Sequence, residues 1–156
     1  MLRRLLPLAL ALAACGPGES LPEAPAAEGG GIAVLDPFLP APPADVAAVY
    51  LRVVDRGGRG DRLLGASSPS AASAMLHRTV MEGDAVRMGP APDGIAVPPG
   101  GEIRLAPGAD HVMLMGLASP LAAGDRLELE LVFERAGRLR VRVPVIPLES
   151  ALEHAR

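Results

Sequence analysis

Apolar and polar residues alternate along two neighbouring stretches near the end of the chain. Every second position is apolar in residues 126–134 and 138–145: Leu127, Leu129, Leu131, Phe133, Leu139, Val141, Val143 and Val145. A period of two places these side chains on one face of a strand. Ala136-Gly137 lies between the stretches, so the pattern predicts two antiparallel strands joined by a turn.

Shorter apolar runs precede these two. They cover residues 32–35, 46–54, 63–66, 74–80, 85–88, 102–105 and 111–117. Turn residues separate them, and none of the intervening stretches has helical periodicity. Short strands with a turn signal about every 8–12 residues are typical of an antiparallel sandwich or barrel. The sequence therefore predicts an all-β domain over residues 32–147, followed at 148–156 by a tail that is a short helix or frayed.

The first fourteen residues differ in composition from the rest. Arg3 and Arg4 precede an uncharged apolar run from Leu5 to Ala14. This arrangement is typical of a secretory signal peptide. The run is shorter than the about 20 residues that a membrane-spanning helix needs. We therefore expect residues 1–14 to be a signal peptide and the protein to be exported.

The end of this run, Leu12-Ala13-Ala14-Cys15, resembles the lipobox of bacterial lipoproteins. The resemblance implies that Cys15 is acylated and anchors the protein to a membrane on its periplasmic side, since several acyl chains bind a bilayer stably. The residue after Cys15 is Gly16 and not the Asp that would retain a lipoprotein in the inner membrane. It therefore favours the outer membrane, in a cell that has one. The alternative is an ordinary secretory signal with a chance cysteine.

Residues 15–31 join this anchor to the β-domain. The segment is rich in Pro, Gly, Ala and Glu and has no aromatic or β-branched residue. Such a composition cannot bury a core, so we expect a flexible linker.

Composition excludes several classes of function. Cys15 is the only cysteine, so the domain has no disulfide and no thiol for catalysis. A chain with net charge −3, two Phe, one Tyr and no Trp lacks the basic surface and stacking residues of a nucleic-acid binder. No motif supports a Ser-His-Asp or Cys-His arrangement, so we do not expect an enzyme.

Methionine and histidine concentrate in one part of the chain. All Met residues except Met1, and two of the three His, lie between residues 75 and 115: Met75, His77, Met81, Met88, His111, Met113 and Met115. A single Met is usually a core residue, because its flexible side chain fills gaps. The strand expected over residues 111–117 places His111, Met113 and Met115 on one face. The third histidine, His154, lies in the tail and is expected to be solvated.

The chemistry of this set favours copper. Thioether sulfur is soft and uncharged, which makes it a poor ligand for Zn²⁺, Ca²⁺ or Mg²⁺. Soft sulfur ligands select Cu(I), and imidazole also suits copper. A blue-copper electron carrier is excluded, because it requires a Cys thiolate.

The spacing of these residues resembles that of the periplasmic PCu(A)C copper chaperones. The family pattern is His, ten residues, Met, about 21 residues and His-x-Met. Here ten residues separate His77 from Met88, and 22 residues separate Met88 from His111-Val112-Met113. Residues 63–69, 76–81 and 124–133 also look like family segments, and the resemblance covers about residues 32–145.

The resemblance implies a cupredoxin-like antiparallel Greek-key β-sandwich or barrel. It implies Cu(I) ligands at four positions: His77, Met88, His111 and Met113. Met81 and Met115 are expected beside the ligands or in the core, whereas the role of Met75 is left open. The family's role would be to deliver Cu(I) to the copper site of cytochrome c oxidase subunit II, alongside Sco-type copper proteins.

Two alternatives remain open at this level. The first is a general periplasmic copper-buffering protein. The second is a structural β-sandwich lipoprotein without metal, which would bury its methionines. A copper redox enzyme is less favoured, because no acid–base residues accompany the set.

Overall fold

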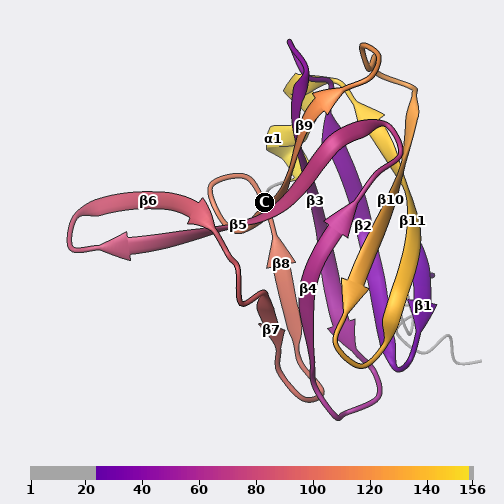
Figure 1. The fold of residues 1–156 in the computed structure, drawn as a ribbon, viewed down its shortest axis with the longest axis vertical. Helices are drawn as coiled ribbons and strands as arrows, with labels where there is room; N and C mark the ends of the chain where they lie inside the picture. Colours follow the sequence, from indigo (N-terminus) through magenta and orange to yellow (C-terminus); the bar gives the residue numbers. More distant parts are fainter. Residues whose placement is uncertain (1–23, 155–156) are drawn as a thin grey trace, which may run out of the picture.

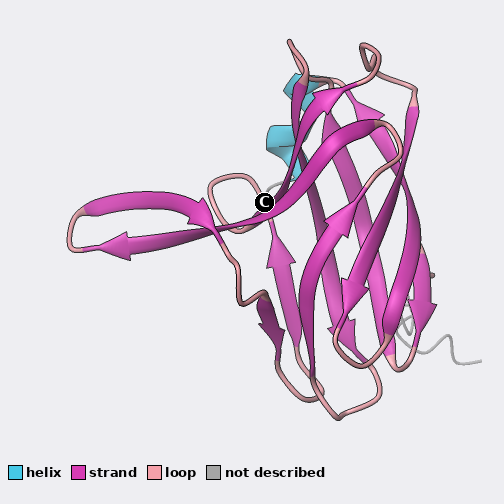
Figure 2. Cartoon of the chain, in the orientation of Figure 1, coloured by secondary structure: helices cyan, strands magenta, loops and turns pink. Residues whose placement is uncertain are grey.

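The computed structural model describes residues 24–154, which are mostly strand, with one short helix after the last strand (Figures 1 and 2). The elements are β1 (Ala27–Gly29), β2 (Ile32–Pro40), β3 (Val46–Asp55), β4 (Asp61–Ser67), β5 (Ala71–Glu82), β6 (Ala85–Pro90), β7 (Ile95–Val97), β8 (Glu102–Leu105), β9 (His111–Leu117), β10 (Arg126–Phe133), β11 (Gly137–Ile146) and α1 (Leu148–His154). Within this part of the chain, no helix has the length and apolar character needed to cross a membrane.

The strands form a sandwich. Hydrogen bonds join them in the order β6-β5-β9-β3-β2-β11-β10-β4-β7, with β1 beside β2 and β8 beside β3. This path folds back on itself, so that β4, β10 and β11 face the layer that contains β3 and β9 (Figure 1). The predicted all-β, cupredoxin-like sandwich is confirmed. One pairing among the described strands is parallel, where Leu39 of β2 lies opposite Val145 of β11.

The predicted alternation produces the core. Leu127, Leu129 and Leu131 of β10 are buried, as are their partners Val143 and Val141 on β11. On β9, Val112 and Leu114 are fully buried, so the side chains on the other face of that strand point away from the core. The residues that pack the core therefore also determine which side chains of β9 point away from it.

β2 is longer than the sequence indicated. Its register shifts between Leu35 and Phe38, and Asp36 adopts φ 47°. Such a bulge accommodates Pro37, which has no N–H to donate. The expected end of this strand at Leu35 was wrong, because the chain bends at the bulge and continues to pair.

Two short strands were not predicted. β1 pairs Ala27 with Val34 of β2, so the expected flexible linker over residues 15–31 is structured at its end. β7 pairs Ile95 with Leu63 of β4. Ile95 is buried at this edge of the sandwich, in what the sequence indicated to be a loop.

Candidate metal centre

β5, β6 and β9 bring the four predicted ligands to one face. His77 of β5 lies directly opposite His111 of β9, and their ring centroids are 5.4 Å apart. Met113 follows two residues after His111 on the same face of β9. Met88 lies opposite Thr79, two residues after His77, so it is a diagonal neighbour of His77 across β5 and β6. Two imidazoles and two thioethers therefore lie on one face of β5, β6 and β9, in three adjacent rows of residues that are paired across the strands.

The pairing shows why the alternation survives around the longer spacing between Met88 and His111. The pairing of β5 with β6 has no register shift from His77 to the turn before Ala85. The pairing of β5 with β9 has none from His77 back to Ser73. The chain between β6 and β9 instead forms β7, β8 and their turns. The length of this connecting segment therefore does not disturb the face that carries the predicted ligands His77, Met88, His111 and Met113, which we call the ligand face.

A backbone carbonyl orients His111. Nδ1 of His111 lies 3.0 Å from the carbonyl oxygen of Ala109, which can only accept, so Nδ1 carries the proton. The same carbonyl accepts a hydrogen bond from Oγ1 of Thr79 at 2.9 Å. The backbone N–H of Thr79 donates to the carboxylate of Asp110 at 2.9 Å. This arrangement leaves Nε2 of His111 as the nitrogen with a lone pair for a metal.

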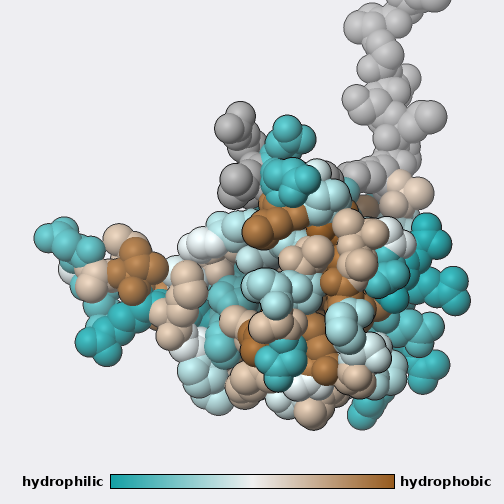
Figure 3. All heavy atoms as spheres, turned by 90° about the horizontal axis from the view of Figure 1, so that it is seen from above, coloured by the Kyte–Doolittle hydropathy of each residue, from teal (hydrophilic) through white to brown (hydrophobic). Residues whose placement is uncertain are grey.

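Burial changes steeply across the set. The His111 residue is 5 % exposed, whereas Met88 is 57 % exposed. Met88 lies on the β5–β6 hairpin, which projects away from the sandwich in Figure 1. In the view from above, apolar side chains are exposed on this hairpin (Figure 3). The site is therefore anchored in the body on one side and open to solvent on the other.

The environment of His77 favours the neutral form of its imidazole. Partial burial lowers the pKa of His77, and the neighbouring His111 lowers this pKa further. A metal needs the unprotonated nitrogen, so this shift extends to lower pH the range in which His77 can act as a ligand. Tyr50 of β3 packs beside His111 with ring centroids 6.3 Å apart, and burial raises its pKa, so it stays a neutral phenol.

The remaining methionines occupy different positions. Met75 lies directly opposite Met113 on the ligand face and is 39 % exposed. Met115 is half-buried, one row further along β9 and opposite Ser73. Met81 is 65 % exposed near the hairpin tip, so it is not a core residue.

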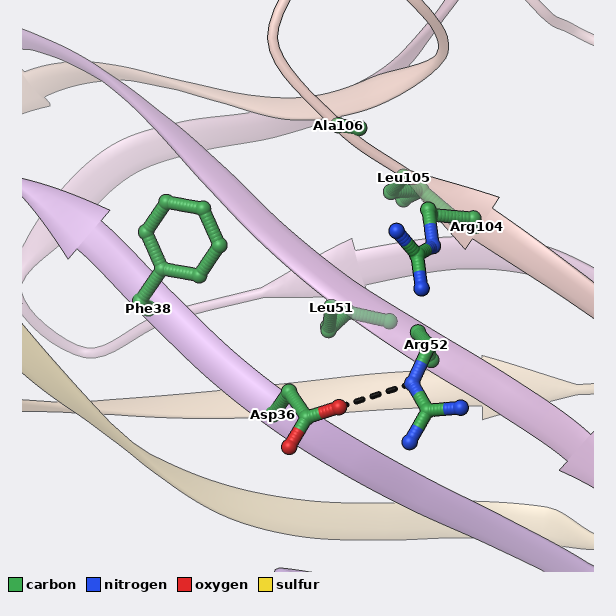
Figure 4. Close-up of a pocket in the computed structure, with 7 residues that line it drawn as sticks. All are labelled: Asp36, Phe38, Leu51, Arg52, Arg104, Leu105 and Ala106. Carbon is green, nitrogen blue, oxygen red and sulfur yellow. Dashed lines mark hydrogen bonds and ion pairs between the residues drawn. The ribbon is translucent and has the colours of Figure 1, made fainter. Parts of the chain in front are cut away.

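The described part of the chain offers no comparable site for a hard metal. Residues 24–154 contain no group of three or more His, Cys, Asp or Glu side chains placed to hold an ion. A pocket of about 130 Å³ on β2, β3 and β8 is lined by Asp36, Phe38, Leu51, Arg52, Arg104, Leu105 and Ala106 (Figure 4). Its lining has neither His nor Met, and an ion pair of 2.7 Å between Asp36 and Arg52 crosses it. It therefore lacks the chemistry of the ligand face.

Sequence reasoning missed the groups that orient the site. Nothing in the spacing indicates that Thr79 and the Ala109 carbonyl hold His111, because these contacts depend on how the loop before β9 meets β5. Tyr50 could have been suspected, since it is the only Tyr of the chain and lies in a predicted strand. Cys15 lies outside the described residues, and so does the side chain of His154.

Comparison with known proteins places the chain in a family. Residues 32–145 match the family described as "Putative lipoprotein LpqE-like". The chain belongs to this family. The LpqE-like protein is 32 % identical to "Putative lipoprotein Lxx21020" of Leifsonia xyli subsp. xyli (strain CTCB07), over 99 % of this chain and 95 % of that protein. Both descriptions name a lipoprotein, in agreement with the predicted export.

Solved structures similar to the LpqE-like protein are copper-binding domains. The copper-bound PCuAC domain from PmoF2 is 31 % identical, with a TM-score of 0.64 over 77 % of this chain and 96 % of that one. The solution structure of CuI-DR1885 from Deinococcus radiodurans is 30 % identical, with a TM-score of 0.60 over 72 % of this chain and 76 % of that one. The resemblance to the PCu(A)C family is thereby confirmed.

Proposed function

We propose that this LpqE-like protein is an extracytoplasmic copper chaperone that binds Cu(I) through two His and two Met residues: His77, Met88, His111 and Met113. The observation that carries the proposal is the pairing of His77 with His111 on a face that also presents Met88 and Met113. The similar solved structures include a copper-bound PCuAC domain and CuI-DR1885, which supports the choice of metal.

The donor set suits a metal that must be both held and released. Imidazole nitrogen and thioether sulfur are neutral, and the combination is soft enough to prefer Cu(I). Without a thiolate, no disulfide can form and block the site in an oxidising compartment. Because Met88 is mostly exposed, ligands of an acceptor protein can approach the copper from the hairpin side.

A titration tests the ligand assignment. Protein from residue 16 onward, which keeps every described residue, is titrated with Cu(I) in competition with a chromophoric chelator. The wild type is expected to bind one Cu(I), and the His111→Ala/Met113→Ala variant to lose this binding. Met81→Leu removes an exposed thioether from the same hairpin and serves as the control with unchanged affinity. Equal binding by the wild type and the double variant would refute the copper site.

A structural lipoprotein without metal is the main competing function. It requires the methionines to pack in the core, yet Met75, Met81 and Met88 are among the exposed large hydrophobic residues. Exposed thioethers beside a pair of histidines favour a role in metal binding over a role in packing the core. A melting temperature that does not respond to Cu(I) would favour the structural function instead.

We further propose that the recipient is the copper site of cytochrome c oxidase, reached directly or through a Sco-type protein. The support is the PCu(A)C relationship. A deletion strain is expected to lose oxidase activity, and wild-type protein, but not His111→Ala/Met113→Ala, is expected to restore it. Normal oxidase activity together with copper sensitivity would instead indicate general copper buffering.

Lipid attachment at Cys15 is a separate proposal, supported by the lipobox and by the lipoprotein descriptions of the family and the relative. Wild-type protein is expected in the membrane fraction of the producing cell, and Cys15→Ser in the soluble exported fraction. Fractionation of inner from outer membrane tests the preference that Gly16 indicates. Membrane association of Cys15→Ser would refute acylation as the anchor.

A further inference from the structure

Met75 holds a position on β5 that mirrors that of Met113 on β9. Met113 lies two residues after His111, and Met75 lies two residues before His77. Because the strands are antiparallel and His77 is opposite His111, these steps lead in the same direction, and Met75 is opposite Met113. Each strand thus contributes one imidazole and, in the next row, one thioether.

This arrangement forms a compact set of four donors on two strands. Side chains directly opposite each other in an antiparallel pair have Cβ atoms about 4.5–5.5 Å apart. Met has three rotatable bonds and adapts its sulfur to its surroundings. Met75 is 39 % exposed, so its side chain is not fixed in the core. Its sulfur can therefore approach a copper ion held by His77 and His111.

Met88 belongs to a different structural unit. It lies on β6, which among the described strands pairs with β5 alone and forms the edge of the sheet. The hairpin of β5 and β6 projects from the sandwich, and Met88 is 57 % exposed. Met113 and Met75 therefore lie on strands paired within the sandwich, whereas Met88 lies on the projecting hairpin.

We propose that Met75 is an additional Cu(I) ligand, which replaces Met88 when the hairpin moves away during copper transfer. The exchange forms one Cu–S bond to Met75 and breaks one to Met88, without a change of oxidation state. Copper keeps two nitrogen and two sulfur donors while the hairpin side of the site is opened to an acceptor. The inference rests on the proposed copper-binding function.

Leucine substitutions test this role, since they remove sulfur and keep an apolar side chain of similar size. Met88→Leu is expected to retain Cu(I) with two sulfur neighbours by X-ray absorption, and the methyl resonance of Met75 is expected to shift on loading. Met75→Leu/Met88→Leu is expected to retain one sulfur neighbour and to bind about tenfold more weakly than Met88→Leu. Met81→Leu/Met88→Leu is the matched control and should behave as Met88→Leu.

The outcomes separate the two proposals. One sulfur neighbour and an unshifted Met75 resonance in Met88→Leu would overturn the role of Met75, while leaving the copper site of the wild type intact. An equal loss of affinity in the Met81→Leu/Met88→Leu control would overturn it as well. Failure of the wild type to bind Cu(I) would refute the proposed function itself. Melting temperatures close to that of the wild type confirm that each variant is folded.

Discussion

The orientation of His111 depends on one backbone oxygen. The carbonyl of Ala109 accepts from Nδ1 of His111 and from Oγ1 of Thr79, so the loop before β9 is tied to β5 at the point where the histidines meet. Groups that orient a metal-binding histidine select the nitrogen that faces the metal and raise affinity. At the proposed site, Thr79 is therefore expected to contribute to copper binding without touching copper.

Replacing Thr79 by Val removes the hydroxyl and keeps the shape of the side chain. We expect Cu(I) affinity to fall about tenfold, the lower end of the range for groups that orient metal ligands. Thr79→Ser keeps the hydroxyl and is expected to bind as the wild type does. Chelator competition measures both. An unchanged affinity in Thr79→Val would show that His111 is oriented without this bond.

Asp55 plays a purely structural part at the far end of β3. Its buried carboxylate accepts hydrogen bonds from four backbone N–H groups, and those of Gly100 and Gly60, followed by Gly57 and Gly58, lower its pKa. A lowered folded-state pKa gives stability that is present above the unfolded value of 3.8 and is lost as pH falls through the folded value.

Asp55→Asn is therefore expected to lower the melting temperature at pH 7, since an amide NH₂ cannot accept these bonds. The difference from the wild type should shrink as pH falls below the unfolded-state pKa of 3.8 and should be smallest below the lower folded-state pKa, where Asp55 of the folded wild type is protonated as well. Asp93→Asn, at an exposed position, is the control and should leave the melting temperature unchanged. Thermal unfolding across a pH series makes the comparison. A difference that is constant with pH would contradict it.

At the scale of the element, the β5–β6 hairpin determines the position of Met88. Glu82 pairs with Ala85, which leaves Gly83 and Asp84 as a two-residue turn. Gly83 has φ 63°, and Gly at the first central position is the signature of a type II′ turn, whose twist matches that of the strands. A change in this turn should alter the site and leave the sandwich intact.

Gly83→Ala imposes backbone strain alone, because nothing lies within 4 Å of the added Cβ. A left-handed conformation costs a non-glycine residue about 1–2 kcal/mol. We expect Cu(I) affinity to fall up to about tenfold, since each 1.4 kcal/mol corresponds to a factor of ten. The melting temperature should hardly change. Gly89→Ala, in the same hairpin at an ordinary φ and also in open space, should have no effect, and an equal loss there would count against the turn.

The elements also show what a sequence can predict. Alternation and turn residues were sufficient for the long strands, and the spacing of His and Met was sufficient to identify the candidate ligands. β1 was missed because Ala27–Gly29 has no β-branched or aromatic residue, and it forms only against β2. The pairing of Met75 with Met113 was missed because strand register depends on the whole sheet, whereas alternation within one strand is local.

At the scale of the molecule, the hydrophobic core and the proposed copper site lie in different parts. The core lies between the layers, with Leu129 and Leu131 of β10 among its fully buried residues. The proposed ligands lie on the outer face of β5, β6 and β9. Substitutions in β10 should therefore change the free energy of unfolding without changing the affinity for Cu(I).

Leu131→Ala tests this separation. Truncating a buried Leu typically destabilises a domain by about 2–5 kcal/mol. Leu64→Ala, at an exposed position of β4, should cost far less. Denaturant unfolding measures both changes, and chelator competition at low temperature should give wild-type affinity for each. Weaker copper binding by Leu131→Ala in its folded state would show that core and site are coupled.

The projecting hairpin has a further consequence for the protein without copper. Within residues 24–154, β6 pairs with β5 and with no other strand, so its amides depend on a pairing that can open without disturbing the core. A copper ion bound to Met88 and to His111 would connect this strand to the sandwich. Amides of β6 would then exchange with deuterium slowly in the loaded protein and quickly in the empty one. The bond between the metal and Met88 would thus determine how long the hairpin stays closed.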